Sequence, residues 1–187
     1  MKVKEIVLAA ATLTGSEKVT AYLEGGEGAQ ADGETLAAAD KFVRLCNIVI
    51  GELAGSYIPM VRTERVTAVN GRIYFTSLSM RALKIRAVYD ASGRKLFYTL
   101  HPEYIEPRGS AAQAEYEYLP DNLGLTDETG YTEKDITAGV LSYGLAAEYC
   151  LAEGRFEEAV LWRKRYSEGV MSFALPRGGV IKSRCFI

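Results

Sequence analysis

The chain has 187 residues, 48% of them hydrophobic and 25% charged, with a formal net charge of −2. A chain of this length can bury a self-sufficient core, and its composition excludes wholesale disorder. Its longest apolar run is too short for a membrane-spanning helix, so no membrane contact is predicted. Three cysteines without a CxxC pair, Cys46, Cys150 and Cys185, fit neither a disulfide framework nor a zinc site and suit a reducing compartment.

The N-terminal segment is predicted to be helical. Apolar residues recur at helical spacing over residues 2–14, and Gly15 is placed to end that helix. Ser16 is placed to cap a short second helix that runs to about Leu23. Residues 24–34 are predicted to form a loop, because four glycines and four acids cannot pack a core.

A long helix is predicted over about residues 34–56, opened by Asp32 or Thr35. Its apolar residues form two adjacent stripes, which indicates burial against more than one neighbour. These stripes consist of Leu36, Phe42, Val43, Leu45, Cys46, Val49, Ile50 and Leu53. Asn47 lies among them and is interpreted as a hydrogen-bonding core residue. Pro59 prevents the helix from continuing.

Between residues 61 and 120 the hydrophobic period changes to that of β-strands. The pair Asn70-Gly71 favours a type I′ turn, so residues 62–69 and 72–78 are predicted to form a hairpin. A second hairpin and two shorter strands are predicted at residues 83–90, 94–100, 104–106 and 113–119. Sequential hairpins favour an antiparallel meander, folded as a small sandwich or a curled sheet.

The polar face of this predicted sheet is basic. It carries Arg72, Arg81, Lys84, Arg86, Arg94 and Lys95. Among these, Arg72, Lys84 and Arg86 are the residues through which we expect the β lobe to contact a partner.

Two further helices are predicted after an acidic connector, residues 120–131. The first helix covers about residues 133–153, and Thr132 with Asp135 resembles a capping box at its start. Small residues along it predict a close crossing with the long helix. They are Ala138, Gly139, Gly144, Ala146 and Ala147, facing Gly51, Ala54 and Gly55 of the long helix. The second helix runs over about residues 156–173.

These elements predict an α+β fold in which a helical bundle of the N- and C-terminal helices carries an inserted antiparallel β lobe. Residues 1–60 and 131–173 form the discontinuous helical domain, residues 61–120 form the β lobe, and residues 174–187 form a basic C-terminal tail.

Recognisable catalytic motifs are lacking. The single histidine, His101, precedes a proline at the end of a predicted strand and is interpreted as structural. The sequence contains no P-loop or GxGxxG motif, and the acids of the 121–133 segment do not have EF-hand spacing. We therefore predict no catalytic, cofactor-binding or metal-binding residue, and a protein that is not an enzyme.

Charge alternates along the chain. The net charge is −3 over residues 1–60, +5 over 61–110, −9 over 111–162 and +5 over 163–187. Solvated faces are one interpretation, and complementary docking between copies or partners is the other.

Several stretches resemble the head–tail connector proteins of tailed bacteriophages and prophages, the adaptor or head-completion proteins that include the tail tubular protein A-like group. The stretches are NIVIGELAGSYIPM (47–60), VTAVNGRIYFTSLS (66–79), AEYEYLP (114–120), SYGLAAEYCLAEGRFEEAVLWRKRY (142–166) and the terminal VIKSRCFI (180–187).

The resemblance implies a non-enzymatic structural protein, assembled in the bacterial host cytoplasm and located in the virion neck. Its copies would form a homo-oligomeric ring below the portal protein, and such proteins are often monomeric until the portal templates them. The helical portion would pack between subunits and against the portal, while the β lobe would face the next tail or neck component. DNA would pass through the ring without being read by sequence.

Under this hypothesis the last helix and the tail contact the portal or a neighbouring subunit. The predicted interface residues are Arg163, Lys164, Arg165, Arg177, Lys182, Arg184, Cys185 and Phe186. One alternative is a non-enzymatic protein-interaction module that binds another partner through the basic β lobe, at Arg72, Lys84 and Arg86. A second alternative, an enzyme, would need a preformed pocket with His101 within reach of an acid and a nucleophile.

Overall fold

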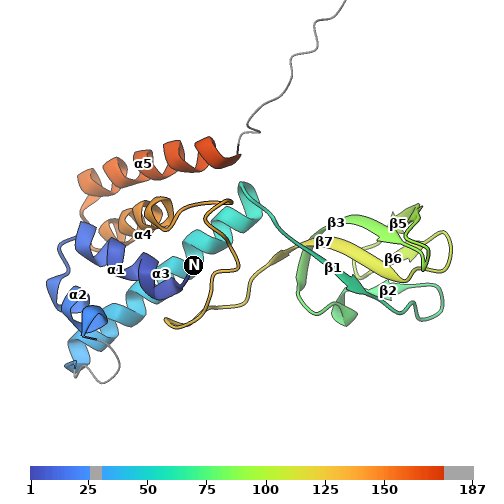
Figure 1. Ribbon diagram of the computed structural model, residues 1–187, viewed down its shortest axis with the longest axis horizontal. Coiled ribbons are helices and arrows are strands. Elements are labelled where there is room, and N and C mark those ends of the chain that lie inside the picture. The colour runs from blue at the N-terminus through green and yellow to red at the C-terminus, as the bar shows by residue number, and fades with distance from the viewer. Residues whose placement is uncertain (26–30, 175–187) are drawn as a thin grey trace, which may run out of the picture.

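A computed structural model describes residues 1–25 and 31–174 of the protein, which form a helical domain and a projecting β lobe (Figure 1). The helices are α1 (Val3–Leu13), α2 (Glu17–Glu24), α3 (Gly33–Ser56), α4 (Ala138–Ala152) and α5 (Phe156–Ala174). The strands are β1 (Met60–Arg65), β2 (Ile73–Tyr74), β3 (Arg81–Tyr89), β4 (Lys95–Leu96), β5 (Tyr98–Leu100), β6 (Tyr104–Pro107) and β7 (Gln113–Leu119), with a 3-10 turn η1 (Phe75–Ser77). The predicted α+β class, with helices before and after the β segment, is confirmed.

The predicted starts and ends of the N-terminal helices are confirmed to within a residue or two. Gly15 has a φ of 71° just after α1, a conformation that glycine adopts at little cost. Asp32 caps α3, because its Oδ1 accepts a hydrogen bond of 2.8 Å from the backbone N–H of Thr35. Ser16 precedes α2, but its side chain makes no capping bond and lies 3.2 Å from the Thr14 hydroxyl.

Asn47 links α3 to the acidic connector, as its predicted hydrogen-bonding role requires. Its Nδ2 donates to the Leu123 carbonyl at 2.9 Å, and its Oδ1 accepts from the Leu123 N–H at 2.8 Å. The same Nδ2 also donates to the Val43 carbonyl one turn earlier in α3. The Asn47 side chain therefore satisfies both the N–H and the C=O of Leu123, which lies outside the helices and strands.

The first C-terminal helix starts five residues later than predicted, at Ala138. Thr132 does bond to Asp135, since its N–H and hydroxyl donate to Oδ2 at 2.8 and 2.7 Å. These bonds close a turn ahead of the helix, however. The residue that caps α4 is Thr137, which has extended backbone angles and whose hydroxyl accepts a hydrogen bond from the Val140 N–H. The capping motif therefore stabilises the approach to α4.

The close crossing of small residues is confirmed at Gly144 and wrong for Gly51 and Gly55. A Cβ atom on Gly144 would lie 2.9 Å from Tyr166 of α5 and from Val49 of α3. At Gly51 and Gly55 a Cβ would meet nothing within 4 Å. α4 therefore approaches both neighbours through its own glycine, and the glycines of α3 lie away from the crossing.

The β lobe consists of two antiparallel sheets. One has the strand order β1-β7-β3-β4, and the other has the order β2-β6-β5. Both sheets contribute to one small core, which contains Ile73, Leu78, Ile85, Val88, Ile105 and Tyr116. Two sheets around one core fit the predicted small sandwich or curled sheet. The strand order is not that of the predicted meander, because β7 lies between β1 and β3 and β6 lies between β2 and β5.

The first predicted hairpin is wrong as a pair of strands. Asn70 and Gly71 do have the positive φ values of the expected turn, 52° and 75°, but the ladder stops after the single bridge between Val69 and Arg72. Ile73 then enters the second sheet, where it pairs with Ile105 and is completely buried. Burial of Ile73 in the lobe core outweighs the local hairpin, and β1 pairs instead with the distant β7.

The second predicted hairpin is confirmed at its turn. β3 pairs with β4 at Val88–Leu96 and Tyr89–Lys95, after which the chain crosses to the other sheet as β5. The two strands that leave the helical domain, β1 and β7, are neighbours in the sheet and carry the lobe (Figure 1). The last predicted segment, the tail, lies outside the described residues from residue 175 onward.

Candidate functional site

Helix α5 carries the most exposed of the large apolar side chains on the surface of the helical domain. Phe156 is 64% exposed and Val160 is 70% exposed, and Met171 is also exposed. These residues are four and eleven positions apart, so they lie along one line of the helix. Lys164 is exposed in the same stripe. The stripe, residues 156, 160, 164 and 171, is called the α5 stripe below.

Arg163, a predicted interface residue, is used inside the subunit. Its guanidinium donates two hydrogen bonds to the Glu52 carboxylate of α3 and lies 3.6 Å from Glu148 of α4. The hydrogen bond to Glu52 raises the pKa of Arg163. This side chain therefore joins three helices within the subunit, while 43% of it stays exposed.

Arg165 lies beside an aromatic pair at the edge of α5. Tyr143 and Trp162 stack with ring centroids 5.8 Å apart, and the Arg165 guanidinium lies 5.1 Å from the Trp162 ring centre. Cation–π contact of this kind holds the guanidinium against the ring while leaving its N–H groups able to donate. The remaining predicted interface residues, Arg177, Lys182, Arg184, Cys185 and Phe186, lie outside the described residues.

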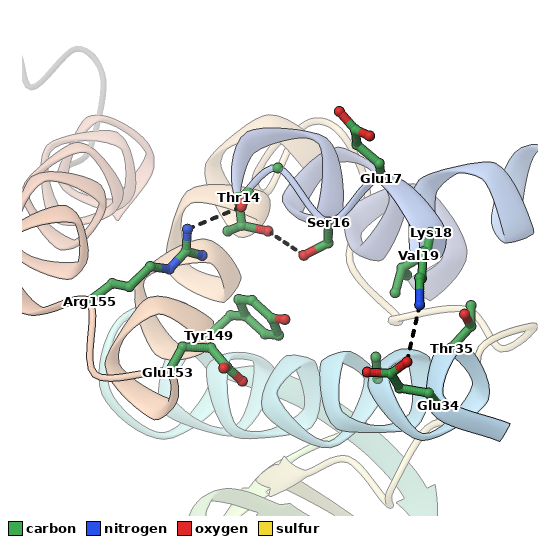
Figure 2. Close-up of a pocket in the computed structure, with 12 residues that line it drawn as sticks. Thr14, Ser16, Glu17, Lys18, Val19, Glu34, Thr35, Tyr149, Glu153 and Arg155 are labelled. Carbon is green, nitrogen blue, oxygen red and sulfur yellow. Dashed lines mark hydrogen bonds and ion pairs between the residues drawn. The ribbon is translucent and has the colours of Figure 1, made fainter. Parts of the chain in front are cut away.

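A cleft of about 530 Å³ opens where the α1–α2 turn, the start of α3 and the α4–α5 turn meet (Figure 2). Arg155 reaches across it and donates to the Thr14 carbonyl at 3.2 Å, while Lys18 donates to Glu34 at 3.1 Å. Sequence reasoning missed this cleft because its walls come from three distant segments.

Within the described residues, the charged residues that line this cleft each pair with another charge, except Glu17. Glu153 accepts a hydrogen bond from Lys41, and Lys41 also lies 5.5 Å from the centre of the Tyr149 ring. Tyr149 in turn stacks on Phe42, with ring centroids 4.1 Å apart. These contacts tie α4 to α3 and account for the polar residues of the cleft as structural.

The predicted basic residues of the β lobe have different surroundings. Arg86 donates to Glu117 at 2.9 Å across the β3–β7 pair, and the Arg72 guanidinium lies 4.7 Å from the centre of the Tyr104 ring. Lys84 has no acidic partner within the described residues. Among these three residues, Lys84 alone has neither an acidic partner nor a ring contact within the described residues.

Lys84 borders a hollow of about 430 Å³ on the lobe, which the sequence did not indicate. The wall on one side is β3, and on the other it is the turn after β5. The lining residues are Phe75, Ala82, Leu83, Lys84, Ile85, Leu100, His101 and Pro102. This hollow is called the β3 groove below.

His101 forms part of the β5–β6 turn. Its ring stacks on Tyr104 with centroids 4.4 Å apart, and its Nε2 lies 3.4 Å from a Glu106 oxygen. Its backbone N–H donates to the Tyr104 carbonyl at 2.9 Å. The groups around it are thus those of a structural turn, and no nucleophile is among them.

Cys46 and Cys150 are both buried. Burial raises the pKa of the Cys46 thiol to about 12 and also raises that of Cys150, so neither forms a thiolate near neutral pH. Within residues 1–25 and 31–174, no group of three or more His, Cys, Asp or Glu side chains is arranged to hold a metal ion. Over the same residues we find no helix that combines the length and hydropathy needed to cross a membrane.

Comparison with known proteins adds no relative: no family model matches the chain, and no curated protein matches it significantly. Two surfaces stand out among the described residues. The α5 stripe belongs to the helical domain, and the β3 groove with Lys84 belongs to the lobe.

Proposed function

We propose that this chain is a head–tail connector of a phage or prophage, a structural neck protein whose copies form a ring below the portal. The observation that supports this most is the α5 stripe, in which Phe156 and Val160 are exposed apolar side chains one helical turn apart; such neighbours on a surface commonly mark a protein interface. Lys164 within it supplies a charge that can fix orientation between partners. In this proposal a neighbouring subunit or the portal covers the stripe.

A ring needs two different contact surfaces on each subunit, since its contacts are heterologous. α3 offers the second, where Ile48 is 56% exposed beside a hollow of about 340 Å³. α4 lies between α5 and α3, because Gly144 packs against both Tyr166 and Val49. The two apolar surfaces therefore belong to different sides of the helical domain, an arrangement compatible with head-to-tail packing.

The β lobe projects from the helical domain on its paired strands β1 and β7 (Figure 1). In the proposed neck it contacts the next tail or neck component, while DNA passes through the ring without being read by sequence. The tail residues, including Arg177, Lys182 and Arg184, dock onto the portal. Assembly takes place in the cytoplasm of the bacterial host.

Electron microscopy of the full chain mixed with the portal of the same phage tests this proposal. We expect a ring on the portal, and Val160→Asp should abolish it because a carboxylate would be buried at the contact. Val69→Asp, a change at an exposed valine of the lobe, is the matched control and should leave the ring intact. A portal without a ring, or a ring that tolerates Val160→Asp, contradicts the proposal.

The tail is tested separately with a chain that ends at residue 174. We expect this truncated protein to keep its circular dichroism spectrum and to lose binding to the portal. Unchanged portal binding would refute the role of the tail and leave the role of the α5 stripe to the first experiment.

A further inference from the structure

One edge of the larger sheet is only partly covered. β3 pairs with β7 along residues 81–89, whereas on its other side it pairs with β4 only at Val88 and Tyr89. Within the described residues, no strand pairs with that side of β3 over residues 81–87. An uncovered edge presents backbone N–H and C=O groups to which another strand can add.

Part of this edge is already occupied, which limits where a strand could add. The Tyr98 hydroxyl donates to the Ile85 carbonyl at 3.1 Å. Leu83 and Arg86 are extra residues relative to β7, so the ladder is irregular at both. The stretch from Arg81 to Lys84 is therefore the one available for an added strand, and it is short.

The β3 groove lies along this stretch and is lined mainly by apolar side chains. Leu83 is 44% exposed on one wall and Leu100 is 61% exposed on the other. A β-bulge commonly re-aims the side chain of its extra residue, as for Leu83 here. Backbone groups at an edge and an apolar hollow beside them are the two features that strand-addition sites use.

The charges around the groove indicate the chemistry of the partner. Arg81 and Lys84 stand at the two ends of the free stretch, and neither has an acidic partner within the described residues. The other edge strand of the sheet, β1, has one arginine that is paired, because Arg62 lies 3.3 Å from Glu64, and one without an acidic partner within the described residues, Arg65. An acidic segment complements the charges of β3, where the apolar groove adds a second contact.

We propose that the β3 edge and groove bind an extended acidic segment of a partner protein. The segment adds as a short strand along Arg81–Lys84, places one large apolar side chain between Leu83 and Leu100, and directs carboxylates to Arg81 and Lys84. The inference does not rest on ring formation, since it uses only the lobe.

Other occupants fit less well. A second copy of β3 would bring Arg81 and Lys84 against like charges, and the chain's own tail is basic through Arg177, Lys182 and Arg184. Single-stranded nucleic acid cannot form a backbone ladder.

Selection of displayed random peptides on the immobilised full-length protein tests the proposal; peptides of about ten residues are long enough to span the groove. We expect enriched peptides to combine acidic residues with a single aliphatic or aromatic anchor. Binding of a synthetic enriched peptide should weaken about tenfold or more in Leu100→Glu and in Lys84→Glu, measured by isothermal titration calorimetry. Leu151→Glu, at an exposed leucine of α4, is the matched control and should bind as the wild type does.

Hydrogen exchange of the complex separates strand addition from binding of a side chain alone. Strand addition predicts slower exchange of the backbone amides in residues 81–84, and weaker binding of a peptide with alternate N-methylated bonds. The proposal is overturned by a selection without enrichment, by basic consensus peptides, by unchanged binding to Leu100→Glu, or by binding of a single-stranded oligonucleotide in place of peptides. Leu100→Glu should leave portal-bound rings intact, so failure here is distinguishable from failure of the connector proposal.

Discussion

The helical domain and the β lobe differ in how far apart in the sequence their core residues lie. The helical core combines residues from both ends of the described chain, from Val3 of α1 to Val170 of α5. The lobe core is built within one continuous segment, residues 60–119, and has only six buried members. The domain with distant partners therefore has the larger core, and the contiguous lobe has the smaller one.

This difference indicates that the helical domain provides rigidity and that the lobe provides an open binding surface. The helices are joined by tight packing and by the Arg163 contacts with Glu52 and Glu148, which makes the helical domain the rigid part. The lobe keeps an open sheet edge and a groove at its surface, and few buried side chains hold it. A single core change should therefore damage the lobe without unfolding the helices.

Ile105→Ala should produce the largest effect and tests whether the two regions unfold separately. Ile105 is completely buried in the lobe core, and an Ile-to-Ala change of this kind costs about 3 kcal/mol. We expect hydrogen exchange to accelerate in the lobe strands while the amides of α1 and α4 keep their protection. Val69→Ala, at an exposed site, should leave exchange unchanged. Equal acceleration in both regions would show that they unfold as one unit.

Gly144→Ala should destabilise the helical domain by about 2 kcal/mol, because the new methyl group would overlap Tyr166 and Val49. Gly51→Ala is the matched change in α3, where a Cβ meets nothing, and should stabilise the protein by up to about 1 kcal/mol through helix propensity. Urea denaturation followed by circular dichroism measures both. The comparison fails if the two substitutions have the same sign.

Lowering the pH should weaken the lobe through Glu64. Burial alone would raise the pKa of Glu64, but hydrogen bonds from the Ser79 hydroxyl and N–H outweigh it and lower that pKa. A lowered folded-state pKa stabilises the fold above the unfolded-state value, and this contribution disappears as the pH falls through the folded-state value.

Glu64→Gln removes this dependence. We expect it to cost about 1 kcal/mol at neutral pH and to leave a shallower loss of lobe stability below about pH 5. Denaturant titrations of both proteins between neutral and acidic pH measure it. Parallel curves for the two proteins would exclude Glu64 as the group responsible.

Tyr166→Phe should have the smallest effect and the opposite sign. The Tyr166 hydroxyl is buried without a hydrogen-bond partner within the described structure, so its removal should be neutral or stabilise by up to about 1 kcal/mol. Tyr131→Phe is the matched change, since the Tyr131 hydroxyl donates to the Ile58 carbonyl at 2.8 Å, and should cost about 1 kcal/mol. Thermal melts distinguish them, and a clear loss of stability in Tyr166→Phe would show that its hydroxyl is paired.

Local sequence signals were sufficient to predict most helices and turns, but not which residues those elements contact in the fold. Gly15, Asp32 and Asn47 act as predicted, because a positive φ, a cap and an amide bridge depend on few neighbours. Thr132 and Asp135 formed the predicted bonds but closed a turn, since the same pair satisfies either geometry. Among the predicted site residues, Arg163 proved to be an internal contact of α5, which no pattern along one helix reveals.

By itself the sequence determined that helices enclose a β segment, because hydrophobic period and turn residues are local properties. It also determined that Asn70-Gly71 would turn the chain, because only their own φ angles are involved. Tertiary structure alone decided that β1 pairs with β7 and that Ile73 joins the second sheet, since the burial of side chains depends on distant strands. The β3 groove arises from that pairing, which leaves one edge of β3 uncovered beside Leu100.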